Sequence, residues 1–182
     1  KKSLQFIYEL YGEHAAVPHA AVVLNNQGIN FNSWRQCWNA DQCYTEALAI
    51  CRKLSQGDDT VEIANTLHNQ GKNYNDAGQY SNADQCYTEA LAVYRKLSQG
   101  DDTVDIANTL NNQGDNYHCM KQYSNADQCY TEALAVFRKL SPDDDTMQIA
   151  NTLYNQGFNH NDTGQYSNAD QCYTEALAVF RK

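Results

Sequence analysis

Cysteine is the residue type whose spacing in this sequence most invites a chemical interpretation. Of the seven cysteines, Cys43, Cys86, Cys129 and Cys172 recur at intervals of 43 residues. No two cysteines form a CxxC pair, and the five histidines never join a cysteine at metal-ligand spacing. Equivalent helices of stacked repeats also lie too far apart for disulfides. The pattern predicts no metal site, and we expect the four recurring cysteines to be small buried hydrophobic residues.

Aspartate is the second residue type with a chemical pattern. It occurs as Asp58-Asp59, Asp101-Asp102 and Asp143 to Asp145, each before a predicted helix. A carboxylate is favourable at the positive end of a helix, whereas a calcium loop needs more ligands than these segments supply. The sequence contains neither a glycine-rich phosphate loop nor a nucleophile motif. It therefore predicts neither an enzyme nor a bound cofactor.

Charge and hydropathy narrow the choice of partner. The net charge of −9 and the pI near 4.8 disfavour binding to nucleic acid or to an anionic membrane surface. The sequence also lacks a run of about 18 apolar residues and a basic, apolar leader. With an odd number of cysteines and no CxxC pair, we expect a reduced, cytoplasmic setting.

An internal repeat is the strongest feature of the sequence. The string IANTL begins at Ile63, Ile106 and Ile149, which are 43 residues apart. The string ADQCYTEALA recurs with the same period and begins at Ala40, Ala83, Ala126 and Ala169. The period predicts one supersecondary unit stacked about four times.

The residue pattern within each repeat predicts two helices. In the second repeat, Asp59 is the expected N-cap of the first helix, with Glu62 three residues later, and Ala77-Gly78 ends the helix. Ser81 is the expected start of the second helix, and Leu97 closes it. Residues at three- and four-residue steps form one face of each helix: Ile63, Leu67, Gly71 and Tyr74 in the first, and Ala83, Tyr87, Ala90, Leu91 and Tyr94 in the second.

Seven of these positions carry a family resemblance. They are Gly71, Tyr74, Gly78, Tyr80, Ala83, Tyr87 and Ala90, and their spacing resembles the tetratricopeptide repeat. The long period and the opening Ala-Asn-Thr-Leu-x-Asn-x-Gly resemble the repeats of kinesin light chain and similar long arrays. The resemblance covers essentially the whole chain. It implies an all-α fold, an α-solenoid in which antiparallel helix-turn-helix hairpins form a right-handed superhelix.

The positions of the repeats predict that the whole chain is one array, which divides into five segments. The chain is then expected to start mid-repeat and to end on a second helix, as an excerpt of a longer array or an array without end caps. The predicted segments are 1–19 (second helix and turn of a partial repeat), 20–62 (repeat 1), 63–105 (repeat 2), 106–148 (repeat 3) and 149–182 (repeat 4, truncated).

The sequence departs from the family pattern in three places, and each departure predicts a structural consequence. Glutamine stands before the repeat glycine, at 27, 70, 113 and 156, where the family usually has leucine. It would weaken apolar packing unless its amide finds partners. Arg35 and Lys121 replace the turn glycine, which predicts less regular turns. Trp34 and Trp38 flank the first of these turns and are expected to pack into the core.

The resemblance implies that partners bind along the first helices, which line the concave surface. A projection at 100° per residue places polar side chains opposite the apolar face of each first helix. An asparagine amide can pair with both the N–H and the C=O of a peptide. Asparagine costs a helix roughly 0.6 kcal/mol relative to alanine, although it can also serve simply as a solvated surface. The candidate partner-binding residues are Asn26, Asn65, Asn69, Lys72, Asp76, Asn108, Asn112, Asp115, Asn151 and Asn155.

Differences between the repeats gather on this face. Lys72 aligns with Asp115 and with Phe158, and His68 aligns with Tyr154. Adjustable recognition on a fixed scaffold would produce this variation, and so would drift at exposed positions. Tyr154 and Phe158 could hold an apolar anchor of a partner, or pack against a following repeat.

Two functions follow from this interpretation. The first is a protein–protein interaction scaffold that holds an extended peptide or a partner helix in the concave groove. The alternative is a structural array that assembles into homo-oligomers by stacking through uncapped ends.

Overall fold

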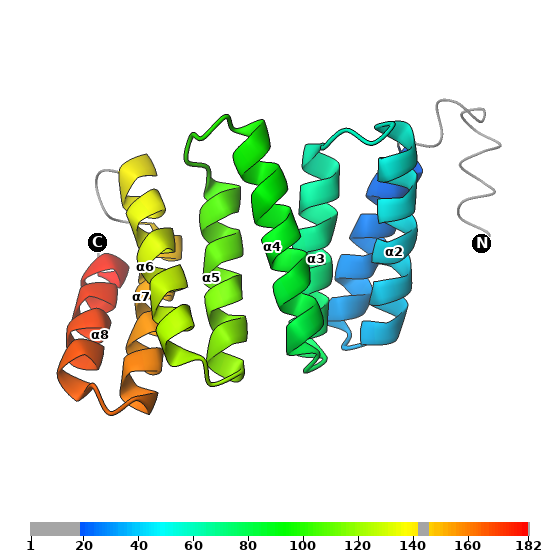
Figure 1. Cartoon of the computed structure of the whole chain (residues 1–182). Coiled ribbons are helices and arrows are strands. Elements are labelled where there is room, and N and C mark those ends of the chain that lie inside the picture. Colours follow the sequence, from blue (N-terminus) through cyan, green and yellow to red (C-terminus); the bar gives the residue numbers. More distant parts are fainter. Residues whose placement is uncertain (1–18, 142–145, 182) are drawn as a thin grey trace. The chain divides into compact units, whose positions relative to one another are not determined.

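The computed structural model of the chain describes residues 19–141 and 146–181 (Figure 1). Most of the predicted partial repeat, residues 1–18, lies outside this part of the chain. The described residues form eight helices joined by short turns, so the predicted all-α fold of helical hairpins is confirmed. Residues 19–33 form the helix before α2, and the others are α2 (Cys37–Leu54), α3 (Val61–Asp76), α4 (Tyr80–Leu97), α5 (Val104–Cys119), α6 (Tyr123–Leu140), α7 (Met147–Asp162) and α8 (Tyr166–Phe180).

The chain divides into two compact units, residues 1–93 and 94–182. In the first unit, α2 packs against α3. In the second unit, α5 packs against α6, α6 against α7, and α7 against α8. Within each unit, these helices therefore pack on their neighbours in sequence, as expected for stacked hairpins. Within these described residues, we find no helix with both the length and the hydrophobicity that a membrane span requires.

Threonine caps the first helices. The Oγ1 of Thr60 accepts a hydrogen bond from the amide of Ile63 at 3.3 Å, and Thr103 and Thr146 do the same for Ile106 and Ile149. The predicted cap at Asp59 is therefore wrong by one residue, because Thr60 is the last extended residue before the helix. The predicted start at Ser81 is also wrong, since α4 begins at Tyr80.

A glycine and a tyrosine set the distance between the two helices of a repeat. The side chain of Tyr87 in α4 is buried, and a Cβ atom placed on Gly71 of α3 would lie only 2.8 Å from its Cε1 atom. Gly114 and Tyr130 repeat this arrangement in the second unit, at 2.6 Å. The ring thus fills the space that a side chain on the first helix would need.

The turns between paired helices keep one geometry whether or not they contain glycine. Arg35 and Lys121 have φ angles of 57° and 59°, close to the 73° of Gly78. The backbone amide three residues after the last helical residue donates in the same way in each turn: Gln36 to Phe31 O at 2.9 Å, Gln79 to Tyr74 O at 2.8 Å and Gln122 to Tyr117 O at 2.9 Å. The expectation of less regular turns at Arg35 and Lys121 is therefore wrong.

The first turn corrects a further expectation. Trp34 and Trp38 are 67% and 73% exposed, so neither packs into the core. Trp34 instead lies edge-on to Phe31, with ring centroids 6.0 Å apart. The turn carries both indoles outward because Trp34 follows the last residue of one helix and Trp38 lies in the first turn of the next.

The glutamines that replace leucine find polar partners. Gln70 donates from Nε2 to Asp41 Oδ1 at 2.9 Å and to Thr45 Oγ1 at 3.3 Å, and its Oε1 lies 3.9 Å from the Cys86 thiol. Gln156 repeats these contacts with Asp127, Thr131 and Cys172. The amide thus joins a first helix to the preceding second helix, so its burial is compensated.

The recurring cysteines share in this arrangement. Cys86 and Cys129 are buried as expected, whereas Cys43 and Cys172 are only partly buried, and all seven cysteines are free thiols. The thiols of Cys86 and Cys129 lie within 4.0 Å of a glutamine oxygen. They are therefore weak hydrogen-bond donors as well as small apolar residues.

Replacing Lys121 by glycine is expected to stabilise the chain. The left-handed conformation costs a residue with a Cβ atom about 1–2 kcal/mol, and the greater flexibility of unfolded glycine offsets part of the gain. We expect a net gain of about 0.5–1 kcal/mol from urea unfolding. The reverse change, Gly164→Lys, at a φ of 74°, should destabilise the chain. A loss of stability in Lys121→Gly would contradict this account.

Replacing Gly71 by alanine is expected to destabilise the chain, although alanine normally favours a helix by about 1 kcal/mol. The added methyl group would collide with Tyr87, and overpacking of this kind costs about 1–3 kcal/mol. We expect a net loss of up to about 2 kcal/mol in the free energy of unfolding, measured with urea. Lys72→Ala, at the exposed next position of α3, is the control and should change stability by no more than about 0.5 kcal/mol.

Candidate functional site

The predicted binding residues of the first unit lie at the surface of its first helices. Asn65, Lys72 and Asp76 of α3 are exposed, and Asn69 is half-buried. Asn26 of the helix formed by residues 19–33 is exposed as well. The apolar positions of α3, among them Ile63 and Leu67, are buried on the other side.

In the second unit, the predicted residues are exposed to different degrees. On α7, Asn151, Tyr154 and Phe158 are exposed and Asn155 is half-buried. On α5, Asn108, Asn112 and Asp115 are all half-buried.

Hydrogen bonds between asparagines connect neighbouring first helices. Asn69 donates from Nδ2 to Asn25 Oδ1 at 3.1 Å, and Asn155 donates to Asn111 Oδ1 at 3.4 Å. Each pair is 44 residues apart, one more than the period, so a search for equivalent residues missed Asn25 and Asn111. Each bond uses one of the two amide hydrogens, and a primary amide can make further hydrogen bonds.

A second row of asparagines is buried and structural. Asn73 donates from Nδ2 to the carbonyl oxygen of Cys37 at 3.0 Å, and Asn159 donates to that of Tyr123 at 2.9 Å. Each therefore joins a first helix to the first residue of the preceding second helix. Part of the asparagine content of this chain holds repeats together and is not available to a partner.

The last turn of α3 and the last turn of α7 each carry an acid that pairs with the preceding first helix. In the first unit, Asn32 donates from Nδ2 to Asp76 Oδ2 at 2.9 Å. In the second unit, His118 takes the equivalent place, with its Nε2 3.4 Å from Asp162 Oδ2. The Nδ1 atom of the same ring lies 3.1 Å from Asn159 Oδ1, and because Asn159 Nδ2 donates to a carbonyl group, Nδ1 is assigned as the donor.

The exposed aromatic side chains of α7 rest on neighbouring rings. Tyr154 contacts Tyr173 with centroids 5.9 Å apart, and Phe158 contacts His118 at 5.0 Å. About half of each α7 side chain stays accessible, 57% for Tyr154 and 45% for Phe158. They form a supported apolar surface beside the asparagines of α7.

Asp115 is held inside its own repeat. It accepts a hydrogen bond from the Tyr130 hydroxyl at 2.8 Å. Burial raises the pKa of its carboxyl group to about 6, while the Tyr130 hydrogen bond and His118 oppose the shift. The charged form of Asp115 is therefore disfavoured in the folded chain relative to the unfolded one.

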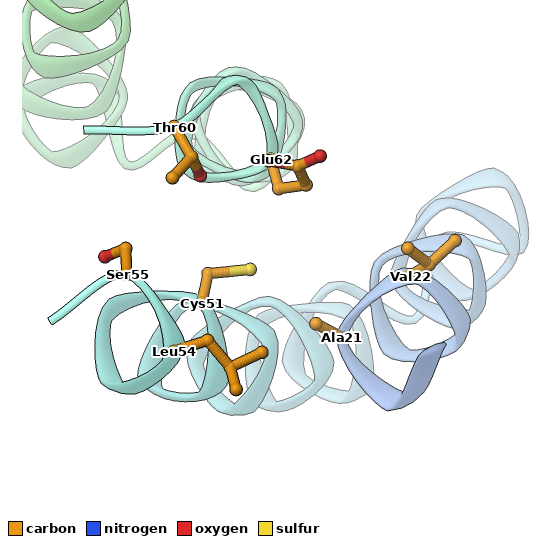
Figure 2. Close-up of a pocket in the computed structure, with 7 residues that line it drawn as sticks. All are labelled: Ala21, Val22, Cys51, Leu54, Ser55, Thr60 and Glu62. Carbon is orange, nitrogen blue, oxygen red and sulfur yellow. The ribbon is translucent and has the colours of Figure 1, made fainter. Parts of the chain in front are cut away.

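A pocket of about 340 Å³ lies in the first unit between the helix of residues 19–33, α2 and α3 (Figure 2). Sequence analysis missed it. An adjoining cavity of about 230 Å³ shares Ala21, Val22, Cys51 and Glu62 and adds Asn25, Asn65 and Thr66. The pocket is lined by Ala21, Val22, Cys51, Leu54, Ser55, Thr60 and Glu62.

The site contains no metal-binding cluster. Across residues 19–141 and 146–181, His, Cys, Asp and Glu side chains nowhere gather in a group of three or more that could hold a metal ion.

Comparison with known families places the chain. The sequence profile described as tetratricopeptide repeat matches residues 20–96, 62–139 and 105–182. The chain belongs to the tetratricopeptide repeat family. Repeats of this family generally mediate protein–protein interactions, so the chain is a domain of the scaffold type.

Solved structures share this fold. The crystal structure of BtubC (BKLC) from P. vanneervenii matches with a TM-score of 0.83 and 20% identity over 99% of this chain and 70% of that one. The apo form of RapI matches with a TM-score of 0.79 and 18% identity over 98% of this chain and 47% of that one. The predicted resemblance to long-period, kinesin light chain-like tetratricopeptide repeats is confirmed. No curated protein sequence matches the chain.

Replacing Asp115 by asparagine is expected to stabilise the chain at pH 7. Because its folded pKa of about 6 exceeds the unfolded value of about 3.9, the folded state binds more protons between pH 4 and pH 6. Stability from this group therefore falls as the pH rises through that range. Asparagine keeps an acceptor for Tyr130 without the charge, so we expect a gain of about 1–3 kcal/mol at pH 7 that disappears near pH 4.

Urea unfolding at several pH values measures this difference. The control is Asp170→Asn, which removes a carboxylate from an exposed position of α8 and should not reproduce the pH-dependent gain. If Asp115→Asn were less stable than the parent chain at pH 7, burial would not be the dominant effect on this carboxyl group.

Proposed function

We propose that the first-helix surfaces of this chain bind an extended peptide segment or a helix of a protein partner, along the concave groove that the family resemblance implies. The observation that carries the proposal is the presence of accessible amides on a first helix of each unit. Asn65 and Asn69 of α3, and Asn151 and Asn155 of α7, are exposed or half-buried. An amide offers a donor and an acceptor, so it suits the backbone of a partner whatever its side chains.

Two further observations favour a partner-binding role for these asparagines over a role as a merely solvent-exposed helix face. Asparagine costs a helix roughly 0.6 kcal/mol relative to alanine, so its use at the exposed positions Asn65 and Asn151 favours a role at the surface. In addition, residues 123–137 of α6 and 166–180 of α8 are identical in sequence. The first-helix position occupied by Lys72, Asp115 and Phe158 differs in charge and polarity between repeats. A constant scaffold with variable contact positions is consistent with a specific partner.

The composition of the surface indicates what the partner contains. Lys72 is the only basic residue among the predicted binding positions, whereas a clamp for a terminal carboxylate needs several cations. Tyr154 and Phe158 instead suit an apolar side chain of the partner. We propose a non-catalytic, cytoplasmic scaffold, and the free thiols of the chain fit a reducing compartment.

A second candidate is self-association, and one observation on α8 favours it. Leu177 and Phe180 are each 52% exposed, whereas the equivalent Leu134 and Phe137 of α6 are buried. In the same unit, α6 packs against the first helix α7. The equivalent exposed surface of α8 is therefore suited to pack against a first helix of a second copy of the chain.

The proposed function is tested by selecting peptides from a random phage-displayed library on the immobilised chain and measuring their affinity by calorimetry. The triple variant Asn69→Ala, Asn112→Ala and Asn155→Ala should weaken the selected peptides by about fivefold for each asparagine they contact, up to roughly 100-fold. Gln42→Ala, Gln85→Ala and Gln128→Ala, at exposed positions of the second helices, form the matched control and should leave affinity unchanged.

The groove proposal would be contradicted if the asparagine variant bound the selected peptides as tightly as the parent chain and the glutamine control bound them more weakly. Light scattering behind a sizing column separates the second candidate. A mass of 20.6 kDa at all concentrations argues against self-association, and a concentration-dependent increase that Phe180→Asp abolishes supports it.

A further inference from the structure

One position at the end of the second helices differs in size between repeats. Cys51, Tyr94, Phe137 and Phe180 are spaced 43 residues apart. Tyr94 and Phe137 are buried, at 6% and 4% exposure. The first unit has a thiol at the position where α6 of the second unit has a phenyl ring.

The pocket of the first unit surrounds this thiol. Figure 2 shows Thr60, the N-cap of α3, and Glu62 of α3 across the pocket from Cys51 of α2. Four lining residues have an identical residue 86 positions later in the chain: Ala21 and Ala107, Leu54 and Leu140, Ser55 and Ser141, and Thr60 and Thr146. Four of the seven lining positions thus carry the same residue in both units, whereas position 51 has a thiol where position 137 has a phenyl ring.

The pocket is large enough for an aromatic side chain. A cavity of about 150 Å³ suffices to hold benzene, and this pocket measures about 340 Å³. Glu62 is the single charged residue among the seven that line it. Burial, followed by the effect of Glu62, raises the pKa of the Cys51 thiol, so the thiol adds an uncharged surface.

The pocket also adjoins the proposed binding surface. The neighbouring cavity shares four lining residues with it and reaches Asn25 and Asn65. Asn25 accepts the hydrogen bond from Asn69. A peptide lying along these asparagines would pass the opening of the pocket and could insert one side chain.

We infer that this pocket binds an aromatic side chain of the partner peptide, which takes the place that Phe137 fills from within its own repeat. This inference rests on the proposed function, since the backbone of the same peptide would lie on the first-helix face. A phenyl or phenol ring is the occupant because phenylalanine and tyrosine occupy the equivalent positions of the other repeats. A ring inserted there would be largely desolvated, which makes it an anchor of the complex.

The test uses the full chain and two small probes, N-acetyl-L-phenylalaninamide and N-acetyl-L-leucinamide, in a ¹H–¹⁵N NMR titration. The phenylalanine probe should give saturable shifts at residues 21–25, 51–55 and 60–66, with the leucine probe at least about fivefold weaker. Cys51→Phe should abolish these shifts, whereas Cys51→Ser, which leaves the pocket open, should retain them. Circular dichroism verifies that each variant folds.

The equivalent position in the second unit provides a gain-of-function test. Phe137→Cys should open a second pocket, with new probe shifts at residues 107–111 and 137–141. If this variant does not fold, the comparison of Cys51→Phe with Cys51→Ser still tests whether the probe binds in the pocket. Absence of probe shifts in the parent chain, or shifts that persist in Cys51→Phe, would overturn the inference.

The library-selected peptides separate this inference from the proposed function. Peptides that need the asparagines but bind Cys51→Phe as tightly as the parent chain would overturn the aromatic pocket and leave the groove standing. Peptides that lose at least tenfold in Cys51→Phe but ignore the triple asparagine variant would support the pocket and contradict the groove. Losses in both variants, with an aromatic residue common to the selected peptides, are the expected result.

Discussion

The close approach of a glycine and a tyrosine is the constraint on which each repeat depends. The ring of Tyr87 occupies the space that a side chain at position 71 would fill, and Tyr130 does the same at position 114. Because the ring lies against bare backbone, the two helices pack closely along their length. The other side chains of the first helix are thereby placed at fixed depths, from buried Ile63 to exposed Lys72.

Amide side chains hold successive repeats together where the family usually has leucine. Gln70 joins α3 to Asp41 and Thr45 of α2, and Asn73 joins it to the first residue of the same helix. A buried amide stabilises only when its partners are in place, so these contacts define the register between repeats more narrowly than apolar packing would. The high content of asparagine and glutamine therefore has two origins, one in stacking and one at the first-helix surface.

The contacts within and between repeats restrict which residues can differ from one repeat to the next. The second helices carry the tyrosine, the alanines and the partners of the buried amides, and their sequences are nearly constant. The first helices vary more, as the position occupied by Lys72, Asp115 and Phe158 shows. Cys51 is a change of another kind, because it lies at a buried position and leaves a pocket in place of a ring.

The helical hairpins, their period and the faces that they bury could be predicted from the sequence alone, since these follow from local periodicity in 43-residue units. The exposed asparagines of α3 could be predicted as well, because a helical projection separates them from Ile63 and Leu67. Which amides form hydrogen bonds is visible only in the three-dimensional structure: the bond between Asn69 and Asn25 spans 44 residues, and Asp115 pairs with Tyr130 of another helix. Likewise, the small residue at position 51 became a pocket only when three helices enclosed it. Such contacts depend on distances between separate helices, which the spacing along one helix does not encode.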